Sequence, residues 1–342
     1  MNISPRPILI NLALLVIAAL LSIGVGPVFI PPDTVTRMLV DRLPWIAINP
    51  DWPEAFSAIL FQIRLPHTAL MLLTGAALGG SGAAYQGLFR NPLADPYLIG
   101  VASGAALGAV AALTIQWPSS LMGMYTLPAS AFLGAMITIA VVYNLARVGR
   151  AVPTTTLILA GVAFSAFATS LMSFLMLRSN TEMRRALTWL LGGAIMSGWQ
   201  PVMAMLPYEL IGLGILAASG HALNVMQFGE EQAQQLGLPI ERIKLFLIVA
   251  ASITTAAAVS FSGVIGFVGL VAPHVVRLLW GPDYRRLTPL AILAGGSALL
   301  LADMLARIVL APQILPVGIV TALAGAPFFL WILRRAKTQA YW

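Results

Sequence analysis

The chain has 342 residues, of which 59% are hydrophobic and 9% are charged, and its formal net charge is +7. A soluble protein carries about a quarter charged residues, so this composition excludes a water-facing globular surface. Cysteine is absent, which excludes disulfides, thiolate metal sites and thiol catalysis. The basic residues stand singly between apolar runs, which is typical of membrane topology signals, so we expect no nucleic-acid partner.

The apolar residues form runs that are long enough for about ten bilayer crossings of roughly 20 residues each. The first run, residues 7–32, is longer than the core of a cleavable signal peptide and is predicted to be a retained span. The run 96–146 is interrupted by loop-forming residues at 116–120, which predicts two helices. The predicted spans cover residues 8–30, 64–88, 97–115, 122–146, 154–177, 201–219, 243–262, 267–280, 288–307 and 316–335.

This pattern predicts an all-α, polytopic membrane protein with a single transmembrane domain over residues 1–342. Ten spans place both termini on one side of the membrane. With the termini inside, the inner segments hold 12 of the 19 basic residues and the outer segments hold 7, so both termini are predicted to be cytoplasmic. The outer segments 31–63 and 178–200 are long, and residues 182–191 are predicted to form a short amphipathic helix.

The sequence lacks the phosphate loop that binds ATP. Such a loop ends in Gly-Lys-Ser/Thr, whereas the only lysines, Lys244 and Lys337, follow an isoleucine and an alanine. If the protein uses ATP, another chain must bind it. We expect no cofactor and no metal ion on this chain.

The motif Gly79-Gly80-Ser81-Gly82 allows two interpretations. It fits the Gly-x-Ser-Gly of an intramembrane serine protease, with His221 or His274 as the base. It equally fits close helix packing, because small residues at four-residue spacing let two backbones approach. The same spacing recurs at Gly75/Gly79, Gly100/Gly104 and Gly104/Gly108.

Two acidic residues lie in predicted spans and are therefore functional candidates, since an unpaired charge in a bilayer is unfavourable. Asp303 stands four residues before Arg307, a spacing that predicts an ion pair on one helix. Glu209 has no partner that the sequence identifies. An ion-coupled secondary transporter that uses both carboxyl groups for protons is the alternative function.

Ser165, Thr169 and Ser173 recur every four residues on one predicted helix. They could line a path for a large polar solute. Equally, their hydroxyl groups could bond to their own helix or to a neighbouring helix. The sequence leaves both interpretations open.

Residues 229–239 form the most informative polar segment. Gly229 opens it, Gly237 and Pro239 close it, and the residues between are good helix formers with two acids in the first turn. This pattern predicts one short helix at the membrane surface that suits docking to a partner. A plain connecting loop is the alternative.

Short motifs spread over nearly the whole chain carry a family resemblance. They cover residues 64–66, 75–87, 90–96, 100–104, 157–162, 189–193, 229–239, 263–277, 301–307, 315–318 and 325–327. In these motifs the chain resembles the permease subunit of the ATP-binding-cassette importers for iron(III)-siderophores, haem and cobalamin, which are type II importers of the FecCD type.

The resemblance implies a ten-helix permease that moves an iron complex or cobalamin by alternating access, without covalent chemistry and therefore not as an enzyme. It implies a homodimer, two separate ATPase subunits that bind ATP and Mg, and an extracytoplasmic substrate-binding protein. The implied location is the lipid bilayer of a bacterial or archaeal cytoplasmic (inner) membrane, crossed several times. The permease sequence does not indicate which of these substrates is carried.

The resemblance also implies three sets of site residues. In the family, basic residues on the outer rim pair with the binding protein; the matching positions are Arg64 and Arg307, with His67 where a second arginine is common. The implied inner gate falls on Thr154 and Thr155, and the implied path runs along the dimer axis. The implied contact with the ATPase subunit consists of Gly229, Glu230, Glu231, Gln232, Ala233, Leu236, Gly237, Leu238 and Pro239.

Overall fold

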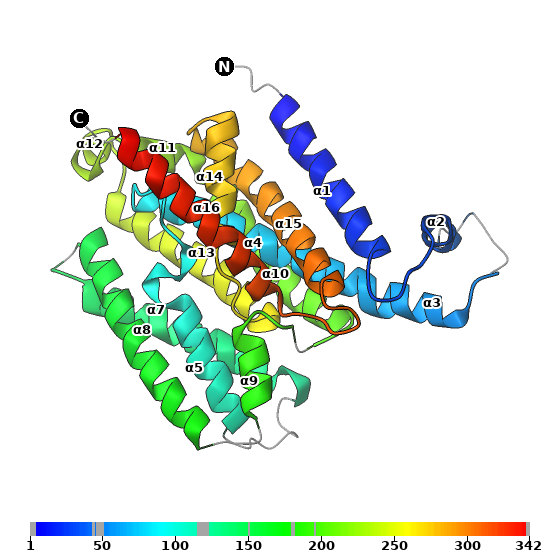
Figure 1. The fold of residues 1–342 in the computed structure, drawn as a ribbon. Coiled ribbons are helices and arrows are strands. Elements are labelled where there is room, and N and C mark those ends of the chain that lie inside the picture. Colours follow the sequence, from blue (N-terminus) through cyan, green and yellow to red (C-terminus); the bar gives the residue numbers. More distant parts are fainter. Residues whose placement is uncertain are drawn as a thin grey trace.

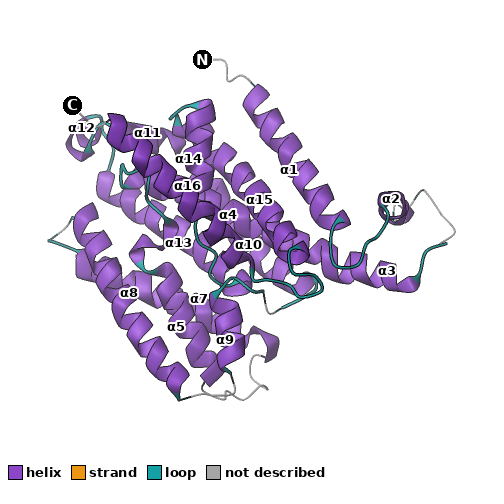
Figure 2. Cartoon of the chain, in the orientation of Figure 1, coloured by secondary structure: helices purple, strands orange, loops and turns teal. Residues whose placement is uncertain are grey.

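The computed structural model describes residues 5–42, 45, 51–114, 123–149, 151–178, 182–194 and 196–339. Helices joined by loops make up this part of the chain, and no strand occurs in it (Figure 1, Figure 2). The all-α, polytopic architecture predicted from composition is therefore confirmed. The loop expected at 116–120 lies outside the described residues.

Each predicted span corresponds to one apolar helix. Among the described residues, seven helices are long and apolar enough to cross a membrane, and three apolar helices (α5, α14 and α16) are shorter. The helices that match the predicted spans are α1 (Arg6–Gly24), α4 (Leu65–Leu88), α5 (Val101–Thr114), α7 (Thr126–Ala146), α8 (Thr154–Leu177), α10 (Trp199–Ala218), α13 (Ile240–Ser262), α14 (Val268–Trp280), α15 (Tyr284–Ile308) and α16 (Val317–Gln339).

Shorter helices connect the apolar ones. The amphipathic helix expected at 182–191 is present as α9 (Met183–Leu190), and the helix expected in the segment 229–239 is present as α12 (Glu230–Gln235). The predictions did not include α2 (Pro32–Asp41), α3 (Glu54–Ala58), the π-helical turn Ile59–Arg64 and α11 (Gly220–Met226). The turn joins α3 to α4, so that this helical stretch runs from Glu54 to Leu88, ten residues earlier than predicted.

The first span ends earlier than predicted, at Gly24 instead of residue 30. Prolines at positions 27, 31 and 32 explain the difference, because proline cannot donate a backbone hydrogen bond and disfavours helical conformation in the residue before it. The chain then turns back through α2. Ile23, Ile30 and Met38 of this region share a small apolar cluster with Leu60 of the π-helical turn.

The centre of the molecule is a close pair of helices, α4 and α15, which α10, α13 and α14 surround (Figure 1). A Cβ atom on Gly79 would lie 2.2 Å from the carbonyl oxygen of Ala291, and one on Gly75 would lie 2.4 Å from that of Gly295. A second close pair, α5 and α7, has the same basis, since a Cβ atom on Gly108 would lie 2.1 Å from the carbonyl oxygen of Ser130. The small-residue spacing therefore serves helix packing, as one of the two interpretations predicted.

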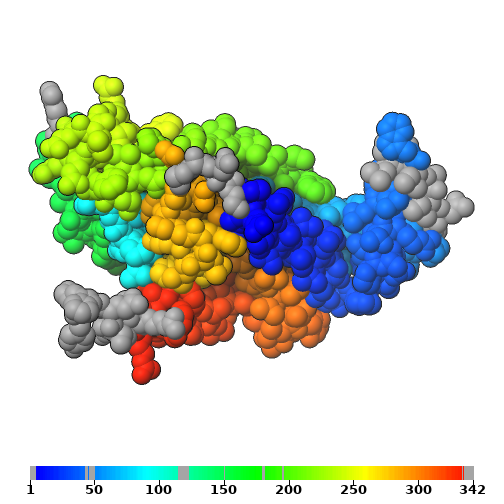
Figure 3. All heavy atoms as spheres, turned by 90° about the horizontal axis from the view of Figure 1, so that it is seen from above, coloured from blue at the N-terminus to red at the C-terminus, as the bar shows by residue number. Residues whose placement is uncertain are grey.

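The described ends of the chain lie on the same side of the bundle. In Figure 1 the start of α1 and the end of α16 are at the end of the molecule that carries α11 and α12. Figure 3, which views this end from above, shows the yellow-green atoms of that region uncovered at the surface. The first residues of α4 and the last residues of α1 and α15 lie at the opposite end, which we call the α9 end (Figure 1).

Candidate functional site

Helix α12 stands outside the apolar bundle as a separate short element. It begins after Gly229, whose φ of +111° favours glycine, and Ala233 on its inner face is fully buried. Its outer face is open, with Phe228 before it and Leu236 after it each 67% exposed. Two exposed apolar side chains beside Glu231 give this surface the mixed character of a protein interface. The arrangement fits a docking element better than a plain connecting loop.

Helix α11 carries α12 and is fixed to the bundle by hydrogen bonds. The side-chain amide of Asn224 donates to Asp283 (2.6 Å), and its oxygen accepts the backbone N–H of Tyr284 (2.8 Å). Gln227 donates to the carbonyl oxygen of Gly87 at the end of α4 (2.9 Å). The helix that precedes α12 is thereby tied to α4 and α15, the central pair.

Asp283 also caps α15, since its carboxylate accepts the backbone N–H of Arg285 (3.0 Å). The hydrogen bond from Asn224 lowers the pKa of Asp283 most, and the bond from Arg285 lowers it further. Partial burial opposes these effects. The carboxylate is therefore held in its charged form.

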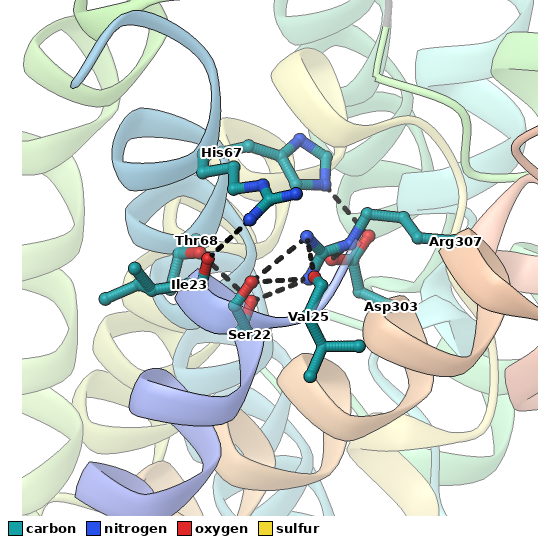
Figure 4. A network of polar contacts seen from close by, with 8 residues as sticks. Ser22, Ile23, Val25, His67, Thr68, Asp303 and Arg307 are labelled. Carbon is teal, nitrogen blue, oxygen red and sulfur yellow. Dashed lines mark hydrogen bonds and ion pairs between the residues drawn. The ribbon is translucent and has the colours of Figure 1, made fainter. Parts of the chain in front are cut away.

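At the α9 end, both arginines that the resemblance assigned to the outer rim point into the protein. Arg64 is 4% exposed and Arg307 is 5% exposed. Arg307 donates to the carbonyl oxygens of Ser22 and Val25, each at 3.1 Å (Figure 4). Arg64 donates to the carbonyl oxygens of Ile23 (3.2 Å), Gly24 (3.1 Å) and Val28.

These acceptors lie at and just beyond the C-terminus of α1, where the last carbonyl groups of a helix lack partners within the helix. Two guanidinium groups satisfy them, and their positive charge is favourable at this end of the helix dipole. The structure therefore gives Arg64 and Arg307 a role in holding α1 against α4 and α15. Their contact with a binding protein stays a prediction.

Asp303 of α15 lies between Arg307 and His67. One carboxylate oxygen lies 3.0 Å from Nε of Arg307, the pair predicted from the four-residue spacing, and the other lies 2.9 Å from Nε2 of His67 (Figure 4). The side chain of His67 is 30% exposed, whereas that of Asp303 is 5% exposed. Of the three residues expected to contact the binding protein, His67 is thus the one that solvent reaches. The contact of His67 with Asp303 could not be predicted from the chain pattern, because 236 residues separate the two.

The expected gate residues begin α8. Thr155 is exposed and Thr154 is half-buried, while the hydroxyl group of Thr156 bonds to the carbonyl oxygens of Ala146 (3.0 Å) and Pro153 (2.8 Å). The gate segment is therefore fixed to the end of α7. Whether it opens and closes stays a prediction.

Two of the three hydroxyl groups proposed to line the path form hydrogen bonds. Ser165 accepts a hydrogen bond from Ser103 of α5 (3.0 Å), and Ser173 donates to the carbonyl oxygen of Thr169 (2.8 Å). Both bonds are of the kind expected from the packing interpretation. Thr169 and Ser173 are nevertheless exposed on the surface of this chain, so the path interpretation stays open for this face of α8.

The geometry gives the protease alternative no support, and it leaves one of the two carboxyl groups of the ion-coupled alternative without a partner. The hydroxyl group of Ser81 is buried and donates to the carbonyl oxygen of Ala251 (3.2 Å), whereas His221 accepts a hydrogen bond from Arg285 (2.6 Å) at the α12 end. Glu209 is fully buried, and neither of its carboxyl oxygens has a hydrogen-bond partner among the described residues. Asp303, the second proton-carrier candidate, is already in contact with His67 and Arg307.

In the part of the chain that the structure describes, ten apolar helices pack through glycines and carry a polar helical element outside the bundle, which is the architecture of a multi-pass membrane protein. The chain belongs to the FecCD transport family, whose model matches residues 14–335. It is a permease subunit of an ATP-binding-cassette importer and is located in the inner membrane.

Relatives and solved structures agree with this assignment. The cobalamin import system permease protein of Halobacterium salinarum is 42% identical over 99% of this chain and 92% of that protein. The Fe(3+)-citrate import system permease protein of Bacillus subtilis is 36% identical over 96% of this chain and 94% of that protein. A metal-chelate type ABC transporter in an inward-facing conformation superposes with a TM-score of 0.81 at 31% identity, covering 96% of this chain and 99% of that one.

Proposed function

We propose that the chain forms a homodimer that imports a metal chelate, with two ATPase subunits docked on α12 and its flanking residues 229–239. ATP and Mg bind to the ATPase subunits, because the sequence has no phosphate loop. Both termini then lie in the cytoplasm, on the side of α12. The observation that carries the proposal is the exposed surface of α12 and its flanking residues. Phe228 and Leu236 are each 67% exposed, although Gln227, which precedes them, is hydrogen-bonded to the end of α4.

The substrate class follows from the relatives, whose names specify cobalamin and Fe(3+)-citrate. We infer an iron complex (siderophore or haem) or cobalamin, which a binding protein delivers to the α9 end. We assign contact with that protein to Arg64, His67 and Arg307, of which His67 is the most accessible.

The test is transport in liposomes that contain the permease, its ATPase subunit and its loaded binding protein. We expect ATP-dependent uptake of one of three substrates, a ferric siderophore, haemin or cobalamin, and no uptake without the ATPase subunit. Glu231→Arg should reduce binding of the ATPase subunit by about tenfold, as expected for a reversed charge at an interface. Arg178→Glu, which reverses an exposed charge at the far end of α8, is the matched control.

Two results would contradict the proposal. Uptake at full rate without any ATPase subunit would favour the ion-coupled alternative, in which case Glu209→Gln should abolish it. Normal binding of the ATPase subunit to Glu231→Arg and to a variant with Phe228→Ala and Leu236→Ala would remove the docking assignment.

A further inference from the structure

Lys244 is one of the two lysines in the sequence and lies almost completely inside the protein, at 3% exposure. It stands in the first turns of α13, directly behind α12. An ammonium group has three N–H donors, and this one has three acceptors. They are a carboxylate oxygen of Glu230 (3.0 Å), a carboxylate oxygen of Glu241 (2.8 Å) and the carbonyl oxygen of Val152 (3.0 Å).

The three acceptors belong to three segments of the chain. Glu230 is the first residue of α12, Glu241 belongs to α13, and Val152 lies two residues before α8. The second carboxylate oxygen of Glu241 accepts the backbone N–H of Val152 (3.1 Å). The N–H and the carbonyl oxygen of Val152 are therefore both hydrogen-bonded to these charged side chains. Val152 is itself 3% exposed.

The cluster connects the docking element to the expected gate. Within the part of the chain that the structure describes, the ion pair between Glu230 and Lys244 is the only side-chain hydrogen bond or ion pair from α12 to another segment. On the other side of Lys244, Val152 leads through Pro153 directly into Thr154 and Thr155. A single buried cation therefore joins the surface that would receive the ATPase subunit to the start of α8.

Moving these segments apart would be costly. A buried ammonium group that loses an acceptor keeps its desolvation penalty, and charge-assisted hydrogen bonds are about twice as strong as neutral ones. The side chains of Glu230 and Glu241 are 40% and 38% exposed, so water can compensate the carboxylates, but it cannot reach Lys244 in the same way. A displacement of α12 is therefore expected to carry the residues around Val152 with it.

We propose that Lys244 is a positioning residue that transmits movement of α12 to the first turn of α8. The inference rests on the proposed function, because it takes α12 to be the element that the ATPase subunit moves. It adds the route by which the movement reaches the inner gate. The Lys244 cluster is defined here as Lys244, Glu230, Glu241 and Val152.

The variants are Lys244→Met, which keeps the apolar stem and removes the charge, and Lys244→Arg, which keeps the charge. Arg242→Met is the matched control, since it removes a positive charge two residues away on α13 that has no hydrogen-bond or ion-pair partner among the described residues. All are assayed as the full complex in liposomes. For Lys244→Met we expect unchanged binding of the ATPase subunit and a drop of about tenfold or more in substrate transported per ATP hydrolysed, the scale of one charge-assisted hydrogen bond.

A labelling experiment separates transmission from mere structural support. The chain has no cysteine, so single cysteines can be introduced without background. An environment-sensitive fluorophore is attached to Gln234→Cys on α12 or to Ala151→Cys beside Val152, both of which are exposed. We expect both labels to respond to ATP in the parental complex, and only the label on α12 to respond when Lys244→Met is added. Lys244→Arg should restore part of the response at position 151.

The possible results are distinct. An undiminished ATP response at position 151 in Lys244→Met would overturn the inference while leaving docking on α12 intact. No response of the α12 label in the parental complex would overturn the proposed function and the inference with it. Loss of ATPase binding or of thermal stability in Lys244→Met, but not in Arg242→Met, would assign Lys244 a purely structural role and would also overturn the inference.

Discussion

The buried charges at the α9 end show how a single residue can hold two helices together. Arg307 pairs with Asp303 and donates to carbonyl groups in the last turn of α1 and just beyond it, so one side chain connects α1 to α15. Removing one partner of a buried ion pair leaves the other uncompensated, which is more harmful than removing both. The residue therefore matters for stability whatever it contacts outside the protein.

We predict that Arg307→Leu lowers the free energy of unfolding by about 3 kcal/mol, the range measured when one partner of a buried pair is removed. Adding Asp303→Asn should recover part of this loss, because no buried carboxylate then lacks its cation. Thermal unfolding in detergent measures both effects. Arg178→Leu, at an exposed site, is the control, and equal stability of the two arginine variants would refute the assigned role.

A second residue-scale prediction concerns pH. The bond from Asn224 lowers the pKa of Asp283, so the charged form contributes stability above the ordinary pKa of an aspartate and this contribution disappears as the pH falls through the lowered value. Asp283→Asn should therefore reduce the melting temperature at pH 7, and the difference from the parental protein should shrink as the pH falls below 3.8, the ordinary pKa of an aspartate. The loss should be about 1 kcal/mol or less, because the carboxylate is largely solvated. A difference that is independent of pH would contradict this explanation.

At the scale of elements, the packing of α4 against α15 depends on the absence of side chains. A Cβ atom on Gly79 would lie 2.2 Å from a backbone oxygen, which a rotamer change cannot relieve. We predict that Gly79→Ala separates the two helices and lowers both the yield of folded permease and its melting temperature. Gly214→Ala on α10, where no atom lies within 4 Å of the added methyl group, should leave both unchanged. Equal behaviour of the two variants would show that the close contact is not required.

The sequence allowed the apolar helices to be predicted well and their surroundings poorly. Hydrophobic runs determine where a helix crosses a membrane, so the ends of α8 and α14 agree with prediction within a residue. Elements such as α2 and α11 escaped prediction, because they are short and are stabilised by contacts with other segments instead of by their own pattern. The four-residue spacing of glycines predicted close packing but not the partner helix.

The same distinction applies to the site residues. The pair Asp303–Arg307 was predictable because both residues lie one turn apart on one helix. The buried positions of Arg64 and Arg307 and two of the three partners of Lys244 were not, since they depend on segments that are distant in the chain. Glu241, three residues before Lys244, was the one sequence signal for the Lys244 cluster, because residues three apart on a helix can form an ion pair.

For the whole molecule, the helices that are least buried within this chain indicate which surfaces contact lipid and which contact a second copy of the chain. Helices α1 and α8 both expose large apolar side chains, such as Leu14 (53%) and Phe167 (60%). They differ in the polar residues among them, because α8 also exposes Thr169, Ser170 and Ser173. Hydroxyl groups gain nothing from contact with lipid tails, so the α8 face suits a second copy of the chain and a path between the two copies. The α1 face suits lipid.

We predict that a water-soluble, membrane-impermeant thiol reagent modifies Thr169→Cys at least about tenfold faster than Leu14→Cys, because thiol reactivity depends on access to water and on formation of the thiolate. Both positions lie well inside their helices and are exposed on this chain, and the native sequence has no cysteine to interfere. The measurement is the rate of modification in liposomes. Ser173→Cys, which is exposed one turn from Thr169 on the same face of α8, tests the dimer, since its thiol should form a disulfide between two copies if the α8 faces meet. Equal, slow modification of Thr169→Cys and Leu14→Cys would mean that α8 also faces lipid. The homodimer and its central path would then have to involve a different surface.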